Sequence, residues 1–240
     1  MRGRGAFVAL TLAVAATAHA QGHGPVQISF GSGSDTGYLR LVLLFASVSL
    51  APALLAVVTS FARIVVVLFF LRAGLGSQQL IPNPVLIGLA LLLTVVTMAG
   101  PLQQVNTRAL QPLLAGRMAP PAAWEAAQAP ARQFFTAHVR AEDLQLFEQF
   151  AADTVDKQPA LPTLAAAYAI SELRAAFIIG FVIYLPFLVI DLVVAGTLGT
   201  LGLGTMPAAV LSLPFKVLLF VMVDGWRLLS YALLSSLGGS

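Results

Sequence analysis

The chain has 240 residues, of which 58% are hydrophobic and only 10% are charged, whereas soluble domains carry about 25% charged residues. A soluble fold so poor in charge could not cover its own surface, so the composition indicates a membrane protein or one enclosed by partner proteins. The chain has no cysteine, which excludes disulfides, thiolate metal sites and cysteine nucleophiles. With only His19, His23 and His138 available, we do not expect a histidine-ligated catalytic metal. No run of lysine or arginine indicates a nucleic-acid-binding surface.

The N-terminus has the form of a cleavable signal peptide covering residues 1–20. Arg2 and Arg4 precede a short apolar stretch, and Ala18-His19-Ala20 is an A-x-A cleavage sequence that predicts processing after Ala20. The apolar stretch is too short to span a hydrocarbon core of about 30 Å. Residues 21–38 follow, are rich in Gly, Ser and Gln, and are expected to form a flexible leader.

Four apolar segments follow, and they predict an all-α integral membrane protein built from long kinked helical hairpins. They cover residues 39–71, 84–105, 165–198 and 207–234. As one helix, the 33 residues of the first segment would extend about 50 Å, so it must kink near Pro52, tilt or protrude. Pro82 and Pro84 suit the start of the second helix, and Gly100-Pro101 marks a kink or exit.

The region between the second and third segments differs in composition, because it holds much of the chain's charge. Its apolar residues recur at helical spacing and include Phe134, Phe135, His138, Leu144, Phe147 and Phe150. This pattern predicts a small amphipathic helical domain, and no strand pattern appears anywhere.

A cleaved signal would leave the mature N-terminus outside the cytoplasm, and counting spans then places the region after the second helix in the periplasm. We therefore predict a first helical hairpin over residues 39–105, a periplasmic amphipathic helical region over residues 106–162, and a second helical hairpin over residues 163–240.

Charged residues inside the third and fourth apolar segments are the main candidates for a functional site. They are Glu172, Arg174, Asp191, Lys216, Asp224 and Arg227. In the fourth segment, twelve Leu, Val and Phe residues favour membrane insertion by roughly 4–7 kcal/mol. Its three charges oppose insertion by as much as about 7–10 kcal/mol, so this helix needs partner helices or a wet interior.

Two interpretations of these charges stand side by side. They could line a path or carry out chemistry, or they could pair across packed helices or subunits. Pairing is favoured because Asp224 and Arg227 are i,i+3 neighbours. Glu172 and Lys216 have no opposite charge at i±3 or i±4, so we predict that they pair with each other between helices.

The connection between the last two segments has glycines at 196, 199, 202 and 204 and ends in Met206-Pro207. One interpretation is a tight helix–helix turn with small-residue packing. The other is a deformable apolar constriction in which Met206 is the flexible plug residue.

Enzymatic and transport alternatives find less support. Asp191 and Asp224 lie in separate apolar segments, as in an intramembrane aspartyl protease, but neither sits in a G-x-G-D motif, and no G-x-S-x-G or H-E-x-x-H occurs. A small-solute secondary transporter would use broken helices, which Pro186 and the glycines permit. Four spans are few for such a protein, and no inverted repeat is visible.

Six blocks of sequence occur in a fixed order: residues 61–67 (FARIVVV), 71–72 (LR), 82–90 (PNPVLIGLA), 167–177 (AYAISELRAAF), 186–193 (PFLVIDLV) and 213–226 (LPFKVLLFVMVDGW). Together they resemble the flagellar biosynthesis protein FliP family, the export-gate subunit shared with type III secretion. The signal peptide favours the flagellar branch.

The resemblance implies a homo-oligomer, typically a pentamer, that forms an export conduit with FliQ-like and FliR-like subunits. Unfolded flagellar substrates would pass through it, driven by an FlhA/FlhB-like export apparatus, at the bacterial inner membrane within the flagellar basal body. The resemblance implies no catalytic residue and no cofactor. It also implies that the hairpins form a helical assembly largely above the bilayer plane, so that protein buries them as much as lipid does.

Residue roles carry over only where blocks match. Glu172, Asp191, Lys216 and Asp224 fall in matching blocks and are the expected assembly contacts. The constriction of relatives is rich in methionine next to a proline, whereas here only Met206 precedes Pro207.

Overall fold

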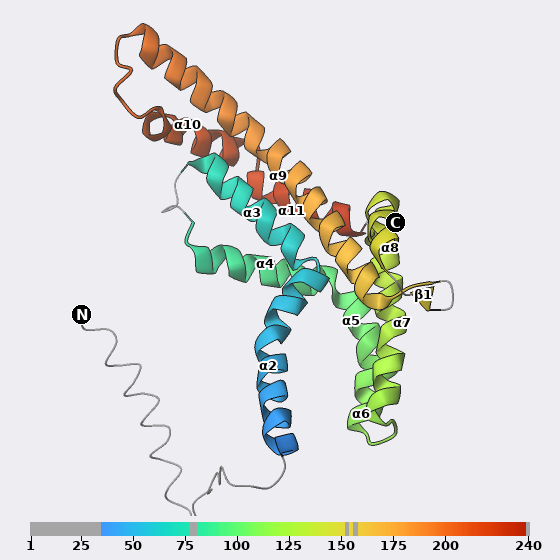
Figure 1. The fold of residues 1–240 in the computed structure, drawn as a ribbon. Coiled ribbons are helices and arrows are strands. Elements are labelled where there is room, and N and C mark those ends of the chain that lie inside the picture. The colour runs from blue at the N-terminus through green and yellow to red at the C-terminus, as the bar shows by residue number, and fades with distance from the viewer. Residues whose placement is uncertain (1–34, 77–80, 152–153, 156–157, 239–240) are drawn as a thin grey trace, which may run out of the picture. The chain divides into compact units, whose positions relative to one another are not determined.

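A computed structural model of the chain describes residues 35–76, 81–151, 154–155 and 158–238 (Figure 1). The predicted signal peptide, its cleavage residue Ala20 and most of the predicted leader lie outside these residues. The chain divides into two units, Met1–Ser47 and Val48–Ser240. The described part of the first unit is the beginning of one helix, and all other elements belong to the second.

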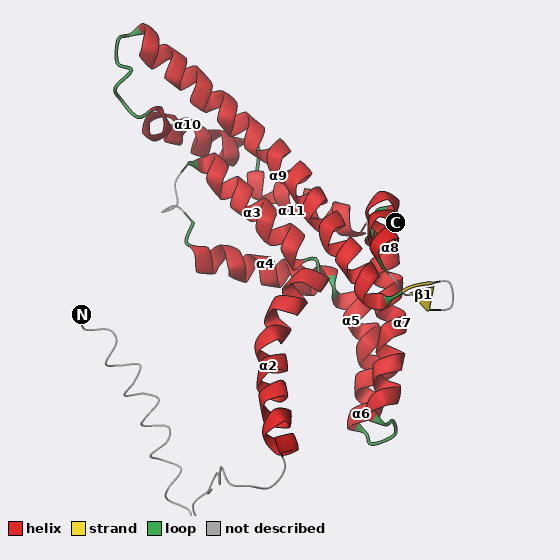
Figure 2. Ribbon diagram, in the orientation of Figure 1, coloured by secondary structure: helices red, strands yellow, loops and turns green. Residues whose placement is uncertain are grey.

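The described residues are almost entirely helical, which confirms the predicted all-α class (Figure 2). The helices are α2 (Asp35–Val58), α3 (Phe61–Leu75), α4 (Asn83–Thr97), α5 (Ala99–Val105), the π-helix η2 (Asn106–Leu110), α6 (Gln111–Leu114), α7 (Pro120–His138), α8 (Ala141–Phe150), α9 (Leu161–Thr200), α10 (Ala208–Met222) and α11 (Gly225–Gly238). The exception is an antiparallel pair of two-residue strands, β1 (Thr154–Val155) and β2 (Gln158–Pro159). Strands this short cannot produce the alternating pattern by which strands are predicted.

Of the breaks in the first two apolar segments, the one at Thr59 and Ser60 was not predicted from the sequence, whereas the bend next to Gly100-Pro101 was. The first segment is divided at Thr59 and Ser60, where the Ser60 carbonyl accepts from Ile64 N at 3.1 Å and begins α3. The second starts at Asn83 after Pro82, as predicted, and bends by 62° at Met98, next to Gly100-Pro101.

The fourth segment is not one helix, because α10 and α11 meet at 63° around Val223 and Asp224. Asp224 has φ 51°, a left-handed conformation that few residues other than glycine adopt. Asp224 is therefore a break residue and not, as predicted, a charge inside a continuous helix.

Helix α3 is the centre of the core. Ile64, Val67, Leu68 and Leu71 are fully buried, against α4, α9 and α11. The neighbouring residues from these helices are Leu86, Ala90, Ala176, Phe187, Leu229 and Leu233. The two predicted hairpins therefore share one core, with α3 of the first inserted among helices of the second (Figure 1).

Helices α3 and α9 pack closely because each supplies a glycine opposite a phenylalanine of the other. Phe187 lies over Gly74, where an added Cβ would come within 2.5 Å of its ring, and Phe70 lies over Gly180. The later residue of α3, Gly74, contacts the later residue of α9, Phe187, so the two helices run parallel.

A second, smaller core joins α7 and α8 to the start of α9. Phe135, Leu164 and Tyr168 are buried there, with Phe134 and Leu144 packed around them. This confirms the predicted amphipathic helical character, although Phe150, expected on the apolar face, is 82% exposed.

One described helix, α9, is long and apolar enough to cross a membrane, and the number rises to four if each bent helix pair counts as one span. Its 40 residues extend about 60 Å, roughly twice the hydrocarbon thickness.

Gly180 tests the close α3–α9 contact. We expect Gly180→Ala to lower the free energy of unfolding by about 1–3 kcal/mol, because the new methyl group would overlap Phe70. Gly196→Ala, on the same helix with nothing within 4 Å of the added Cβ, should leave stability unchanged or raise it by about 0.5–1 kcal/mol. Unfolding curves in detergent measure both variants. An equal change in stability for the two would contradict the close contact between Gly180 and Phe70.

Candidate functional site: two buried charge clusters

The first cluster is centred on an ion pair between α3 and α9. Arg63 Nη2 lies 2.6 Å from Glu172 Oε1, with the two side chains 7% and 0% exposed. Arg63 Nη1 also donates to the carbonyl of Ser236 at 2.7 Å and to its hydroxyl at 3.2 Å. One guanidinium thus joins α3, α9 and α11. A buried charge needs this many partners, because leaving it unpaired costs several kcal/mol.

The same turn of α9 holds the α7–α8 connection through Ser171. The Ser171 hydroxyl donates to Asp143 Oδ2 at 2.7 Å and accepts from Arg140 N at 3.1 Å. Arg174 then pairs with Asp143 at 3.3 Å and with the exposed Glu142 at 3.1 Å. Asp143 is 2% exposed, so this network fixes the start of α8 on α9.

His138 links the end of α7 to α11. Its Nδ1 lies 2.8 Å from the carbonyl oxygen of Phe134, and its Nε2 lies 3.1 Å from that of Leu237. Its ring centroid also lies 4.6 Å from that of Phe134, with the two ring planes tilted by 37°. His138 is therefore a packed structural residue between two helices.

The second cluster joins α9 to α10. Lys216 Nζ lies 2.6 Å from Asp191 Oδ2, and Ser212 Oγ donates to Asp191 Oδ1 at 2.5 Å. Lys216 is 1% exposed, and its ammonium lies beside Gly76, the left-handed residue that caps α3. A cation at the C-terminal end of a helix is stabilised by the helix dipole.

The two clusters lie far apart on α9. Glu172 and Asp191 are 19 positions apart in the sequence, about 28 Å along a helix. The surface between them carries exposed apolar side chains such as Phe177, Phe181 and Val182. Charges therefore bracket an apolar stretch and do not form a continuous polar path along it.

The predicted pair between Glu172 and Lys216 is wrong. Glu172 pairs with Arg63 and Lys216 pairs with Asp191, and these two pairs lie about 28 Å apart along α9. Arg63 was visible as a charge inside the first apolar segment, but its partner could not be identified before the parallel packing of α3 and α9 was known. Asp143 and Ser171, in contrast, gave no sequence signal.

Asp224 and Arg227 are placed differently from the other predicted residues. Both are exposed, and the backbone N of Arg227 donates to the Asp224 carbonyl at 3.0 Å. Within the described residues their side chains form no ion pair. The predicted i,i+3 side-chain pair is therefore not made.

An aspartyl dyad is not formed either. Asp191 is hydrogen-bonded to Ser212 and Lys216, whereas Asp224 lies beyond the end of α10, 8 residues after Lys216. In the described ranges, no three His, Asp or Glu side chains are grouped so that they could hold a metal ion.

The loop between α9 and α10 is short and apolar. Gly202 has φ 74°, and the turn is closed by Met206 N donating to the Leu203 carbonyl at 3.0 Å. Leu201 is 70% exposed, and Leu203 and Met206 are each 45% exposed. Met206 therefore presents its side chain together with two leucines at the tip of the hairpin.

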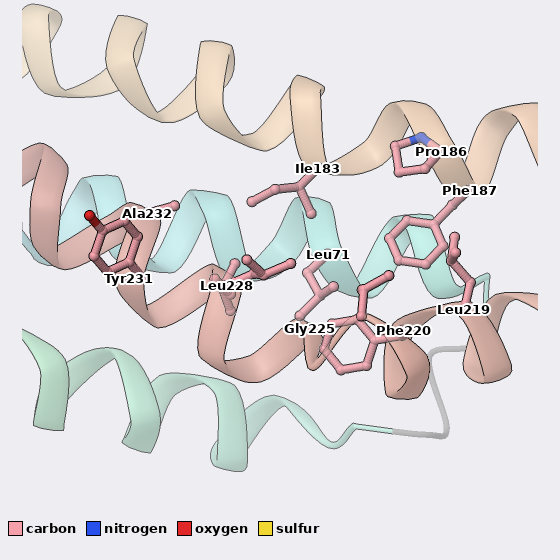
Figure 3. A pocket seen from close by; sticks show the side chains of 12 residues that line it. Leu71, Ile183, Pro186, Phe187, Leu219, Phe220, Gly225, Leu228, Tyr231 and Ala232 are labelled. Carbon is pink, nitrogen blue, oxygen red and sulfur yellow. The ribbon is translucent and has the colours of Figure 1, made fainter.

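An apolar cavity of about 420 Å³ opens beside the α10–α11 break (Figure 3). It lies between Leu71 of α3, Ile183 and Phe187 of α9, Leu219 of α10 and Leu228 of α11. The bend that interrupts the fourth apolar segment leaves this space open.

The Asp191–Lys216 pair can be tested by neutralising one or both partners. We expect Lys216→Met alone to destabilise the protein by about 1–3 kcal/mol, since it leaves a partly buried carboxylate with only Ser212. The double variant Asp191→Asn/Lys216→Met should recover most of that loss. Asp224→Asn, at an exposed carboxylate in a conformation that asparagine tolerates, is the control and should have little effect on unfolding in detergent. A double variant less stable than Lys216→Met would argue against a structural pair.

Comparison with known proteins identifies the family. A model of the FliP family matches residues 44–233. The flagellar biosynthetic protein FliP of Bacillus subtilis is 45% identical, covering 82% of this chain and 91% of its own length. FliP of Caulobacter vibrioides is 42% identical over 97% of this chain and 91% of its own, and that of Aquifex aeolicus is 36% identical over 88% and 91%. The chain therefore belongs to the FliP family and is a membrane-associated component of the flagellar export apparatus.

Proposed function

We propose that the chain is a core subunit of the flagellar type III export gate. Several copies, typically five in the family, would surround a conduit together with FliQ-like and FliR-like subunits. Unfolded flagellar proteins would pass through this conduit, supplied by an FlhA/FlhB-like apparatus.

The observation that supports this proposal most is the distribution of apolar side chains on the α9–α10 hairpin. The buried charged groups of the two clusters, Arg63, Glu172 and Lys216, point inward to partners, while large apolar residues face outward. The exposed ones include Phe177, Phe181, Val189, Leu192, Phe215 and Leu218. A contiguous apolar surface of this kind marks contact with protein or membrane.

Lipid alone does not account for that surface. Helix α9 is about 60 Å long, and the hydrocarbon core covers about half of this length. The remaining apolar length needs another cover, and sister subunits in a helical assembly provide it.

The location that we propose is the bacterial inner membrane, in the flagellar basal body. The chain would be exported with a signal peptide cleaved after Ala20, followed by a leader over residues 21–38. Residues 106–162 would form the periplasmic helical region between hairpins over residues 39–105 and 163–240. The parallel course of α3 and α9 supports this order, since it fits a single crossing of opposite direction, made by the second apolar segment, between them.

The α9–α10 loop is the proposed constriction of the conduit. Met206 would act there together with Leu201 and Leu203, because all three present apolar side chains at one hairpin tip. Flexible apolar side chains can close a narrow passage by excluding water.

The charged residues would serve assembly in two ways. The residues of the two clusters, Glu172, Arg174, Asp191 and Lys216, would shape the subunit so that its apolar face fits its neighbours. Asp224 and Arg227, exposed at the α10–α11 break, would contact neighbouring subunits directly.

The alternative, a small-solute secondary transporter, would need charged groups that face a wet path. The Arg63–Glu172 pair is instead largely buried and joined to α11. This arrangement suits a fixed structural link better than a substrate site.

Co-purification tests the proposed function. Full-length chain expressed with FliQ-like and FliR-like subunits should yield a stable oligomer containing all three. Phe181→Ser, on the outward face of α9, should reduce the yield of that oligomer without unfolding the subunit. Leu114→Ser, which changes another exposed apolar residue but at the end of α6, is the control and should not. A monomer that moves a solute when reconstituted alone would overturn the proposal.

A further inference from the structure

Two cavities lie one after the other along α9 and α11, and we call the two together the trough. The first, about 280 Å³, is lined by Ile179 of α9 and Ser236 of α11. The second, the apolar cavity of about 420 Å³, is lined by Ile183 and Ala232. Each residue of the second pair lies one helical turn, about 6 Å, from its counterpart in the first.

Helix α3 also lines both cavities, and its residues place the cavities in the same order. Arg63 lines the first cavity, and Leu71, 8 residues further along α3, lines the second. Figure 3 shows Ala232 and Tyr231 at one end of the apolar cavity and Phe187 and Leu219 at the other. The end with Ala232 therefore leads toward Ser236 and the first cavity.

The first cavity has the chemistry to hold an anion. Its described lining includes Arg63, His138, Arg140, Ser171 and Ser236, and no acidic residue. The guanidinium of Arg140 makes no ion pair or hydrogen bond within the described residues and is exposed. Arg63 is 6% exposed, and its Nε–H is buried without a partner among the same residues.

The other charges near this cavity are already compensated. Glu172 pairs through Oε1 with Arg63 at 2.6 Å, while its buried Oε2 has no hydrogen-bond partner among the described residues. Asp143 is held by Ser171 and Arg174, and Glu142 by Arg174. Arg140 is thus the cation available to an incoming anion, and arginine binds phosphate oxygens with two parallel hydrogen bonds.

The second cavity has the chemistry to hold a hydrocarbon chain. The side chains that line it are almost all apolar, and its volume lies within the range of about 300–1,000 Å³ typical of ligand pockets. Its lining includes the exposed Tyr231, so a chain can enter there from outside the subunit.

We propose that this trough binds one anionic phospholipid, with its phosphate at Arg140 and Arg63 and one acyl chain in the apolar cavity beside Leu71 and Ala232. A cationic end followed within one helical turn by an apolar cavity matches the two halves of such a lipid. Neither a free phosphate nor a water-soluble peptide would occupy both the cationic end and the apolar cavity. The bound chain would fill the space left by the α10–α11 bend.

Tryptophan quenching by brominated lipids tests this proposal. Trp226 packs on Phe220, which lines the apolar cavity, with ring centroids 5.4 Å apart. Trp124 is the only other tryptophan, so Trp124→Phe in the full-length chain makes Trp226 the single reporter. Vesicles carry brominated acyl chains on either phosphatidylglycerol or phosphatidylcholine.

We expect brominated phosphatidylglycerol to quench Trp226 at about tenfold lower mole fraction than brominated phosphatidylcholine. A difference of about tenfold in affinity corresponds to one additional hydrogen bond to a charged group. Arg140→Gln should abolish this headgroup preference. Arg117→Gln, which removes an exposed arginine outside the trough, should retain it. Ala232→Phe should weaken quenching by both lipids, because the new ring occupies the acyl-chain cavity.

Three results would overturn the proposal. The first is equal quenching by both lipids in the parent protein. The second is loss of the preference on addition of millimolar inorganic phosphate, which would identify a simple anion site. The third is a preference that survives Arg140→Gln while the oligomeric state changes, which would assign the trough to a second copy of the chain.

Discussion

The ion pair between Arg63 and Glu172 is the interaction on which the remaining packing depends. Both side chains lie within apolar helices, where an isolated charge costs several kcal/mol. Each charge is tolerated only because the other lies 2.6 Å away and Ser236 accepts two further hydrogen bonds from Arg63. This requirement fixes the register of α3 against α9 and brings the end of α11 onto the same point.

Steric complementarity extends that register along the helices. Gly180 receives Phe70, and Gly74 receives Phe187, so α3 and α9 approach closely over several turns. At the C-terminal end of α3, Lys216 pairs with Asp191 beside the last turn of the helix. Because the buried charges of α9 and α10 and Gly180 face the neighbouring helices, the outward faces of α9 and α10 are mainly apolar. The subunit is therefore suited to being covered by lipid and by other subunits.

Much of this organisation could be predicted from the sequence, and the remainder depended on tertiary packing. Hydropathy and proline positions predicted the helices and their order, and the low charge content pointed to the membrane. The partners of Glu172 and Lys216 could not be predicted, because any opposite charge in another apolar helix was equally eligible. The left-handed turn at Asp224 was missed for a similar reason, since an apolar segment continues on both sides of it.

A double-mutant cycle on the Arg63–Glu172 pair tests this account most directly. Arg63→Met, Glu172→Met and the double variant would be compared by unfolding of the full-length protein in detergent. If the pair fixes α3 on α9, each single variant loses about 3–5 kcal/mol and the double variant loses much less than the sum of the two. Losses that simply add would show that the two charges act independently and would contradict the account.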